Sequence, residues 1–405
     1  MNENKHIPQG YKNSPLGIIP EEWEVKKICD FGKVITGNTP PTKDVDNYGS
    51  TYMFVSPADI TENKYIKSSE RKLSRKGFSL SRIMPKDSVL FTCIGSTIGK
   101  CAIANEDLTS NQQINAIICN SNHNEEFLYY ELNRRSSRIK LIAGEQAVPI
   151  INKSTFENIK ILCPPLEEQI QICSVLQLWD TAIEKQSVLI EKLKLRKRAL
   201  MQQLLTSKKR LPGFSGEWRE VKLGEIFDER NETNRDDLPL LSITGDKGVI
   251  YQSDSEKRDI SNDDKSKYKR ICPNDIGYNT MRMWQGRSAL SKLEGIVSPA
   301  YTIVIPKENV DVRFMTMLIQ QSRVVYSFWT HSQGLVSDTL NCKYPDFCQV
   351  KVFIPTKTEQ SAIADMFENF DTEIELANKK LVNMQSQKRG LMQQLLTGKK
   401  RIKKL

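Results

Sequence analysis

The heptapeptide LMQQLLT occurs twice in this chain, at residues 200–206 and again at 391–397. The second copy starts 391 − 200 = 191 residues after the first, roughly half of the 405-residue sequence. The same shift relates Glu168-Gln169 to Glu359-Gln360 and Lys197-Arg198 to Lys388-Arg389, with no gap between them. A match held at one offset over about forty residues indicates an internal repeat. We therefore interpret the chain as two copies of one unit, each ending in this segment.

An apolar seam leads into each heptapeptide, with steps that alternate between three and four residues. It is sustained for about five heptads without an internal proline, a pattern typical of a coiled coil. Two ordinary core helices are the alternative, but the seam outlasts the usual helix of about 10–14 residues. The obvious partner of each seam is the other copy. The seam residues are Ile172, Leu176, Trp179, Ile183, Ile190, Leu193, Leu200 and Leu204, then Ile363, Phe367, Phe370, Ile374, Leu381, Met384, Leu391 and Leu395.

Start and stop signals bound both predicted helices. Pro164-Pro165 and Pro355 precede the seams, where proline suits a helix start. Clusters of lysine and arginine at 208–210 and 399–401 follow the seams, where cations complement the helix dipole. The matched seam lysines Lys197 and Lys388 are expected to set the register.

Bulk composition excludes several classes of protein. The sequence has 39% hydrophobic and 27% charged residues and no run of about 18 apolar residues, so no membrane span is expected. No secretory signal is seen, and 9 cysteines without a C-x-x-C spacing disfavour disulfides and zinc sites. Free thiols fit a reducing cytoplasm, where we expect this protein. A net charge of +10 favours an anionic partner such as nucleic acid.

Each helix follows a more variable body. Glu22-Trp23 and Glu217-Trp218 open the two bodies, and both tryptophans are expected to be packing anchors. In the first body we predict strands at 88–92, 101–104 and 116–119 and a helix at 125–141. In the second, 273–280 corresponds to 85–92 and 298–301 to 111–114, with one matching helix at 311–327. The predicted domains are 1–163, 164–210, 211–354 and 355–405.

No pattern in the sequence predicts catalysis. The segment Gly95–Lys100 resembles a phosphate loop, but it has three residues instead of four between its glycines and lacks the Ser/Thr after the lysine. Neither double-proline segment (38–42, 163–166) has the spacing and aromatic residue of an adenine methyltransferase signature. Asp59 with Glu70-Arg71-Lys72 is a short nuclease-like pattern that often arises by chance. The three histidines are isolated. We predict no catalytic residues, no metal site and no chemistry by the chain itself.

The motifs taken together resemble one known family over nearly the whole length. They are PPLEEQ at 164–169, IPTKTEQ at 354–360, the doubled LMQQLLT, the two Glu-Trp pairs and IGSTIGK at 94–100. On these motifs the chain resembles the specificity (S) subunit of type I restriction-modification enzymes. Thr356 departs from the pattern, because the first copy has Pro165 there, and this could shift one helix start.

The resemblance implies an α+β fold, with two pseudo-twofold-related α/β target recognition domains joined by a two-helix antiparallel coiled coil. Each domain would read one half of a bipartite site in double-stranded DNA. The helices would set the spacer and dock two methyltransferase (M) subunits carrying S-adenosylmethionine. Two restriction/motor (R) subunits with ATP and Mg²⁺ are possible further partners. A stand-alone coiled-coil DNA-binding regulator and a protein-binding adaptor are the alternatives.

The bodies contain polar and basic residues that suit DNA contacts. Lysine and arginine bind phosphates, arginine also suits guanine edges, and glutamine suits adenine edges. Trp284 is expected to be a core residue more than a DNA wedge. The predicted phosphate contacts are Lys33, Lys43, Lys100, Arg138, Lys153 and Lys292. The predicted base readers are Asn38, Thr39, Ser96, Gln112 and Gln113 in the first body, and Arg282 and Arg287, on either side of Trp284, in the second.

Overall fold

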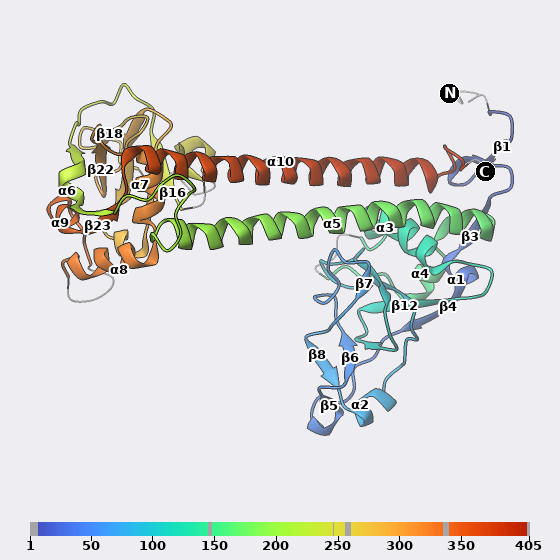
Figure 1. Cartoon of the computed structure of the whole chain (residues 1–405). Helices are drawn as coiled ribbons and strands as arrows, with labels where there is room; N and C mark the ends of the chain where they lie inside the picture. Colours follow the sequence, from blue (N-terminus) through green and yellow to red (C-terminus); the bar gives the residue numbers. More distant parts are fainter. Residues whose placement is uncertain (1–6, 145–147, 246, 256–260, 335–339, 403–405) are drawn as a thin grey trace. The chain divides into compact units, whose positions relative to one another are not determined.

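The computed structural model describes residues 7–144, 148–245, 247–255, 261–334 and 340–402. The chain divides into two compact units: unit 1 contains Met1–Ser187 and Lys380–Leu405, and unit 2 contains Val188–Lys379. Two helices, α5 (Leu166–Leu204) and α10 (Lys357–Leu395), each have 39 residues and contribute to both units (Figure 1). At 1.5 Å per residue each helix is about 58 Å long.

The two long helices begin and end at equivalent places of the repeat. Leu166 follows Pro165 directly, and Lys357 follows Thr356. Thr356 therefore does not shift the helix start. Along both helices every residue of the predicted seam is buried or half-buried. Leu178, which lies outside the seam, is 72% exposed, so the 3.5-residue period and not hydrophobicity alone marks the packed face.

In unit 1 the beginning of α5 pairs with the end of α10. Glu168 accepts a hydrogen bond from Arg401 Nε at 2.6 Å, and Asp180 forms an ion pair with Lys388. The residue numbers rise along α5 while they fall along α10. The two segments are therefore antiparallel within this unit.

In unit 2 the same contacts recur with the helices exchanged. Glu359 accepts a hydrogen bond from Arg210 Nε at 2.6 Å, and Asp371 forms an ion pair with Lys197. Each of these residues is the 191-residue repeat partner of one in unit 1. The antiparallel pairing expected from the family is thus confirmed in each unit, and the seam lysines Lys197 and Lys388 each contact a carboxylate of the facing helix.

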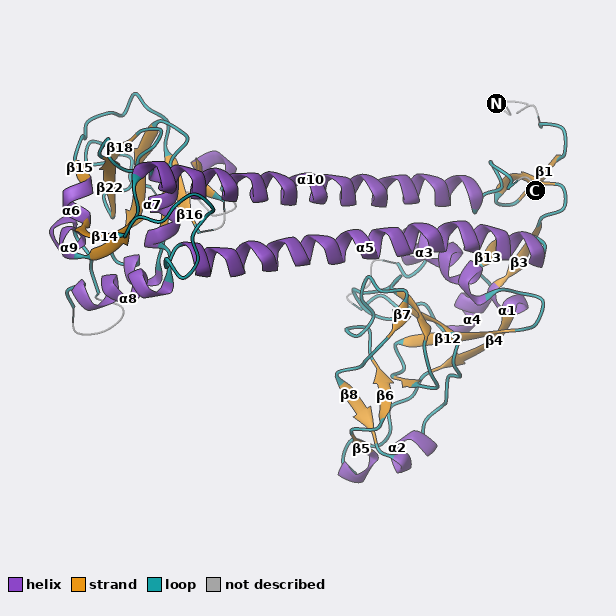
Figure 2. Cartoon of the chain, in the orientation of Figure 1, coloured by secondary structure: helices purple, strands orange, loops and turns teal. Residues whose placement is uncertain are grey.

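Unit 1 contains short strands in several sheets with helices packed beside them (Figure 2). Its strands are β1 (Tyr11–Ser14), β2 (Gly17–Pro20), β3 (Glu24–Lys27), β4 (Gly32–Thr36), β5 (Tyr48–Gly49), β6 (Tyr52–Val55), β7 (Tyr65–Ile66), β8 (Arg71–Leu73), β9 (Val89–Thr92), β10 (Cys101–Ala104), β11 (Thr109–Ser110), β12 (Ile114–Cys119) and β13 (Lys160–Cys163). Its shorter helices are α1 (Ile28–Phe31), η1 (Val45–Asn47), α2 (Arg75–Ser79), α3 (Glu125–Leu141) and α4 (Lys153–Glu157). The predicted helix 125–141 is confirmed as α3.

The central sheet of unit 1 has the strand order β4-β12-β9-β10-β7. A second sheet is ordered β11-β6-β8-β5, and β1-β2 and β3-β13 form pairs. Trp23 is fully buried and donates its indole N–H to Glu168 at 2.9 Å, so it anchors the body to α5 as predicted. One hydrophobic cluster includes Trp23, Phe127 and Leu395, which joins the sheet, α3 and the end of α10 in one core.

Unit 2 repeats the central sheet with the order β15-β22-β19-β20. Smaller sheets pair β14 with β23, β16 with β17 and β18 with β21. The strands are β14 (Arg219–Lys222), β15 (Phe227–Arg230), β16 (Leu241–Thr244), β17 (Gly248–Tyr251), β18 (Lys269–Ile271), β19 (Ile276–Asn279), β20 (Ser288–Leu290), β21 (Gly295–Val297), β22 (Tyr301–Pro306) and β23 (Lys351–Ile354). The helices are α6 (Leu223–Ile226), η2 (Gln252–Asp254), η3 (Met283–Gln285), α7 (Val312–Ile319), α8 (Ser322–His331) and α9 (Tyr344–Gln349).

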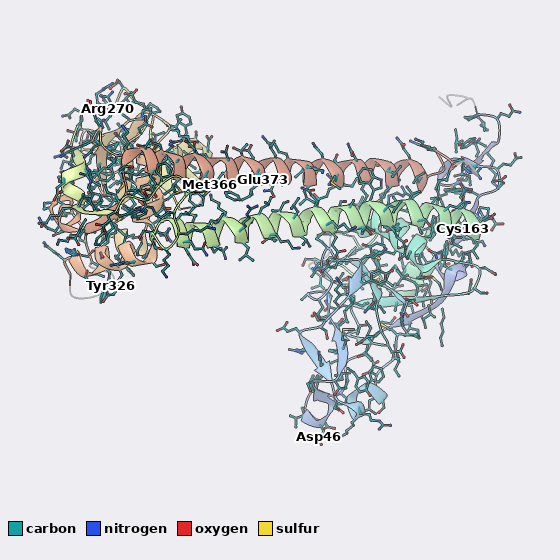
Figure 3. All side chains as sticks on the ribbon, in the orientation of Figure 1. Asp46, Cys163, Arg270, Tyr326, Met366 and Glu373 are labelled. Atoms are coloured by element: carbon teal, nitrogen blue, oxygen red, sulfur yellow. The ribbon has the colours of Figure 1, made fainter. Side chains whose placement is uncertain are left out.

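The single helix predicted at 311–327 is wrong, because the structure has α7 and α8 with a break between them. Ile319 and Val324 both pack into the core of unit 2. In one continuous helix they would point about 140° apart, at roughly 100° per residue, and could not both reach that core. The break also leaves Tyr326 on the outer face of α8, 62% exposed (Figure 3).

A matched pair of substitutions tests the turns that end the two long helices. Gly398 has φ +69°, and a Cβ there would lie 2.4 Å from Pro20 Cδ; its repeat partner Ser207 has φ +55°. L-residues other than glycine pay roughly 1 kcal/mol for this conformation. We expect Ser207→Gly to raise the free energy of unfolding by about 0.5–1 kcal/mol and Gly398→Ser to lower it by about 2 kcal/mol. Urea unfolding of the full chain measures both, and equal effects of the same sign would contradict the turn geometry.

The buried carboxylates of the two long helices give a second prediction. Glu359 is 1% exposed and receives hydrogen bonds only from Arg210 among the described residues, whereas Glu168 also accepts from Trp23. Removing one partner of a buried pair costs about 3–5 kcal/mol. We expect Arg210→Ala to lower the free energy of unfolding by about 3 kcal/mol and Arg401→Ala by clearly less. Urea unfolding measures both changes in the free energy of unfolding. A larger decrease for Arg401→Ala than for Arg210→Ala would contradict this prediction.

Candidate nucleic-acid interface

Three loops of unit 1 leave the central sheet at the same edge. β4 ends at Thr36, which lies opposite Asn115 of β12, and β9 ends at Thr92, opposite Ile114. Because both neighbours are antiparallel to β12, loops 37–43, 93–100 and 111–113 start or finish at this edge. The Thr36 hydroxyl donates to Asn115 Oδ1 at 2.7 Å and ties the two strands together there. We call these three loops the loop edge of unit 1.

The loop edge of unit 1 brings four of the predicted base readers together. Thr39 Oγ1 donates to Gln112 Oε1 at 2.9 Å, and Gln113 Nε2 donates to the Ile94 carbonyl at 3.4 Å. Asn38 Oδ1 accepts from the backbone N–H of Arg82 at 2.7 Å, which fixes the start of the first loop. Thr39 and Gln112 are exposed. A hydroxyl and an amide held beside each other can donate to and accept from a base edge.

Ser96 and Lys100 lie on the second loop, and both have structural contacts. Lys100 Nζ donates to the Pro57 carbonyl at 2.9 Å, and Lys140 Nζ donates to the Ser96 carbonyl at 3.1 Å. Ser96, Lys100 and Lys140 line a cavity of about 620 Å³. The lysine of IGSTIGK therefore holds the loop through a backbone carbonyl, while its charge still faces the cavity.

The other basic residues predicted in unit 1 are dispersed. Lys43 is exposed on loop 37–43, but Lys33 lies toward the far end of β4, opposite Ile118. Lys153 begins α4 and forms an ion pair with Glu157 at 3.5 Å. Arg138, on α3, lines a different cleft, next to the end of α10. The structure does not bring Lys33, Arg138 and Lys153 to the loop edge.

Unit 2 has the equivalent edge with different side chains. β19 ends at Asn279, opposite Tyr301 of β22, just as β9 ends opposite the start of β12. The predicted correspondence of 298–301 with 111–114 fits this register. The predicted match of 273–280 with 85–92 is wrong by one residue, because Asn279 and not Thr280 takes the place of Thr92. Residues 280–287, which include η3, leave at this edge and carry Arg282, Trp284 and Arg287. We call this segment, with the β16–β17 hairpin beside it, the loop edge of unit 2.

A basic cavity of about 560 Å³ opens at the loop edge of unit 2. Arg282, Arg287 and Lys247 line it with Asn279 and Tyr301, and the described lining residues include no carboxylate. The side chains of Arg282 and Arg287 are exposed and form no hydrogen bond or ion pair with another described residue. Two free guanidinium forks in a cavity whose described lining contains no carboxylate are suited to guanine edges and phosphates.

Trp284 is neither a core residue nor a fully exposed one. It is half-buried, and its indole N–H donates to the Met281 carbonyl at 3.0 Å within the same turn. The prediction that Trp284 belongs to the core is therefore wrong: this tryptophan shapes the turn that carries the two arginines. Lys292 is exposed in the turn between β20 and β21 and does not line the cavity.

Sequence reasoning missed Lys247, Asn279 and Tyr301, which line the cavity of unit 2. Lys247 lies in the turn of the β16–β17 hairpin, and nothing in its local sequence indicates that this hairpin packs beside β20. Asn279 and Tyr301 could have been found, because they are the repeat counterparts of Thr92 and Ile114 at the ends of predicted strands.

The described residues form no metal site, membrane span or disulfide. They contain no group of three or more His, Cys, Asp or Glu side chains arranged to hold a metal ion. Within the same residues, no helix is long and apolar enough to cross a bilayer. All nine cysteines are free thiols, and burial raises the pKa of Cys93 to about 12, so its unreactive thiol form dominates near neutral pH.

Comparisons with known proteins agree with this geometry. Residues 20–195 match the family model of the type I restriction modification DNA specificity domain. The type I restriction enzyme MjaVIII specificity subunit of Methanocaldococcus jannaschii is 25% identical over 418 residues, covering 96% of this chain and 95% of that protein. The resemblance to the specificity subunits of type I restriction-modification enzymes is thus confirmed over nearly the full length.

Solved structures share the fold at low sequence identity. A chain from work on complex assembly and conformational transition of the type I R-M system has a TM-score of 0.61 and 15% identity, covering 94% of this chain and 99% of that one. The S subunit of the type I restriction-modification system from M. genitalium has a TM-score of 0.53 and 14% identity, covering 92% and 96%. The architecture is therefore retained where most side chains differ.

The basic cavity of unit 2 gives a prediction about DNA binding. We expect Arg282→Ala and Arg287→Ala each to cost about 1–3 kcal/mol of binding to cognate duplex DNA and to relax selectivity at one base pair, because a guanidinium reads a guanine edge through two hydrogen bonds. Fluorescence anisotropy of the assembled complex with labelled duplexes at several salt concentrations measures this.

Arg219→Ala is the matched control, since Arg219 is an exposed arginine on β14 outside the cavity. It should leave selectivity unchanged. If the Arg282 and Arg287 variants instead bind every duplex sequence more weakly by the same factor, these arginines contact phosphates and do not read bases.

Proposed function

We propose that this chain, which belongs with the specificity subunits of type I restriction-modification enzymes, reads a bipartite DNA site for its complex. It is a non-catalytic subunit of a type I site-specific adenine methyltransferase or endonuclease complex. The observation that carries the proposal is the repeated loop edge: one sheet topology presents Thr39, Gln112 and Gln113 in unit 1, but Arg282 and Arg287 in unit 2.

Each body reads one half of the site. The bodies are residues 1–163 and 211–354, and a repeated protein scaffold suits two half-sites in the way that protein symmetry usually mirrors DNA symmetry. Amide and hydroxyl groups in the first body favour adenine edges, whereas the arginines of the second favour guanine. Because the two sets of side chains differ, the two half-sites have different sequences.

The long helices set the distance between the two half-sites. Ion pairs tie the beginning of each helix to the end of the other, so neither can lengthen independently. A helix pair packed along a continuous apolar seam resists bending, because bending would expose seam residues. The spacer of the DNA site then follows from helix length.

The reactive machinery comes from other subunits. The helices dock two methyltransferase subunits, which bring S-adenosylmethionine for adenine methylation. Restriction/motor subunits, where the complex includes them, bring ATP and Mg²⁺. Access to chromosomal DNA and these partners suits a cytoplasmic location.

Methylation mapping tests the proposal directly. The chain is co-expressed with its methyltransferase subunit in a host lacking DNA methylation, and methylated adenines are located by single-molecule sequencing. We expect one motif with two defined halves and a fixed gap. Tight sequence-specific binding by the chain alone, without any methylation on co-expression, would instead support the stand-alone regulator.

Adding one heptad to both α5 and α10 tests the role of the helices. The seam is preserved and each helix grows by ~10 Å, so the gap should increase by up to about three base pairs while both half-sites stay the same. The control inserts the same seven residues beside Gly213, in an exposed turn where a Cβ would meet nothing within 4 Å. If the wild type, the heptad variant and the control all recognise half-sites with the same spacing, the helices do not determine the DNA spacer.

A further inference from the structure

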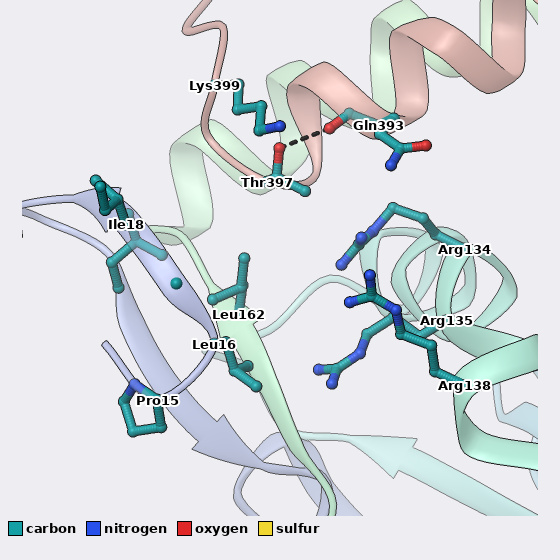
Figure 4. Close-up of a pocket in the computed structure, with 12 residues that line it drawn as sticks. Pro15, Leu16, Ile18, Arg134, Arg135, Arg138, Leu162, Gln393, Thr397 and Lys399 are labelled. Carbon is teal, nitrogen blue, oxygen red and sulfur yellow. Dashed lines mark hydrogen bonds between the residues drawn. The ribbon is translucent and has the colours of Figure 1, made fainter. Parts of the chain in front are cut away.

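A basic cleft in unit 1 lies away from the loop edge. It opens between α3, the β1–β2 hairpin, β13 and the end of α10, and has a volume of about 380 Å³ (Figure 4). Arg134, Arg135 and Arg138 point into it from α3, and Lys399, in the turn after α10, also lines it beside Thr397. None of the proposed DNA-reading loops lines it.

The positive charge of this cleft is only partly compensated. Arg134 donates two hydrogen bonds to the buried Glu131, at 2.8 and 2.7 Å. Arg135 donates to the Lys160 carbonyl and also lies 4.0 Å from Glu131. Arg138 and Lys399 have no hydrogen bond or ion pair from their side chains to any described residue, and the described residues that line the cleft include no carboxylate. Burial lowers the pKa of Arg135 against the attraction of Glu131, which raises it, and Arg134 and Arg138 lower it further. Three guanidiniums within about one helical turn repel one another, so a bound anion is stabilised here.

The opposite wall of the cleft is aliphatic. Pro15, Leu16 and Ile18 of the hairpin and Leu162 of β13 form it, and all but Pro15 are half-buried or buried (Figure 4). A ligand that fits must combine a carboxylate or phosphate with apolar surface a few ångströms away. Two protein side chains, one acidic and one aliphatic, satisfy both walls.

Duplex DNA satisfies only one of these walls. Its phosphates lie on a convex surface, whereas the cations here line a cleft of limited volume. The sugar-phosphate backbone also gains little from covering Leu16 and Ile18, because hydrophobic stabilisation needs apolar area on both partners. A protein segment is therefore the better occupant.

We propose that this cleft docks an acidic, aliphatic segment of the methyltransferase subunit. Arg138 binds its carboxylate, Lys399 adds positive charge at the α10 end of the cleft, and the neighbouring aliphatic side chain packs on Leu16, Ile18 and Leu162. The inference rests on the proposed function and assigns one surface of assembly. It also gives Arg138 a different role from the phosphate contact expected from the sequence.

The test compares two double variants that change the net charge equally. Arg138→Glu with Lys399→Glu reverses both unpaired cations of the cleft. Lys12→Glu with Lys400→Glu is the control, since these exposed lysines lie on β1 and after α10 but do not line it. Binding of purified methyltransferase subunit is measured by biolayer interferometry with wild-type full-length chain and both variants.

We expect at least about tenfold weaker binding for the cleft variant and less than about threefold for the control, because charge-assisted hydrogen bonds are replaced by repulsion. Urea unfolding checks that both variants are folded; Arg138→Gln with Lys399→Gln, which removes charge without reversing it, gives the same ranking. Equal weakening of cleft variant and control would overturn the proposal. So would unchanged assembly with weakened duplex binding, which would make the cleft a phosphate site.

A peptide scan identifies the occupant. Overlapping 15-residue peptides spanning the methyltransferase subunit are probed with wild-type chain and with the cleft variant. Peptides bound only by the wild type should contain Asp or Glu beside Leu, Ile, Val or Met; basic or purely polar peptides would contradict the proposal. Absence of any methyltransferase binding by wild type and control alike would overturn the proposed function itself, an outcome distinct from failure of the cleft alone.

Discussion

A buried glutamate near the start of each long helix imposes the main constraint on this structure. Glu168 and Glu359 are almost fully buried, and an unpaired carboxylate there would carry a large desolvation cost. Each finds its arginine in the turn that ends the other helix. Neither copy of the repeat therefore satisfies its own buried charge. The duplication gives two units that each contain the start of one helix and the end of the other, which explains why the helices repeat closely while the bodies do not.

The bodies preserve backbone topology and vary the side chains at one edge. In unit 1 the end of β9 lies opposite the start of β12, and in unit 2 the end of β19 lies opposite the start of β22. Thr39, Ser96 and Gln112 are exposed on the loops that leave there in unit 1, and Arg282 and Arg287 in unit 2. Loops at a sheet edge can change length and composition without disturbing the strands that hold them. Selection for a new DNA target can therefore act on residues such as Thr39 or Arg282 at little cost to the fold.

The sequence was sufficient to predict the elements that depend on periodicity and repetition. The starts of α5 and α10, the extent of α3 and the correspondence of β9 with β19 follow from local patterns and from the repeat. Contacts that depend on strand order could not be predicted in this way. Thr39 meets Gln112 only because β4 lies beside β12, and Lys33 is remote because it lies at the other end of the same strand. Charge alone did not distinguish Arg138, in its own cleft, from a residue of the loop edge.

Positive charge and base-directed hydrogen bonding can be supplied by different residues or by the same ones. The two loop edges differ in this respect. In unit 1, Arg82 and Lys100 donate to the backbone carbonyls of Thr36 and Pro57. These neutral acceptors leave the positive charge in place to attract phosphates, while direct reading passes to uncharged amides and hydroxyls. In unit 2 the free guanidiniums of Arg282 and Arg287 supply both the field and the donors. Under the proposed function, selectivity and affinity are therefore coupled in the second body, whereas the first can change its base preference while keeping its electrostatic attraction to DNA.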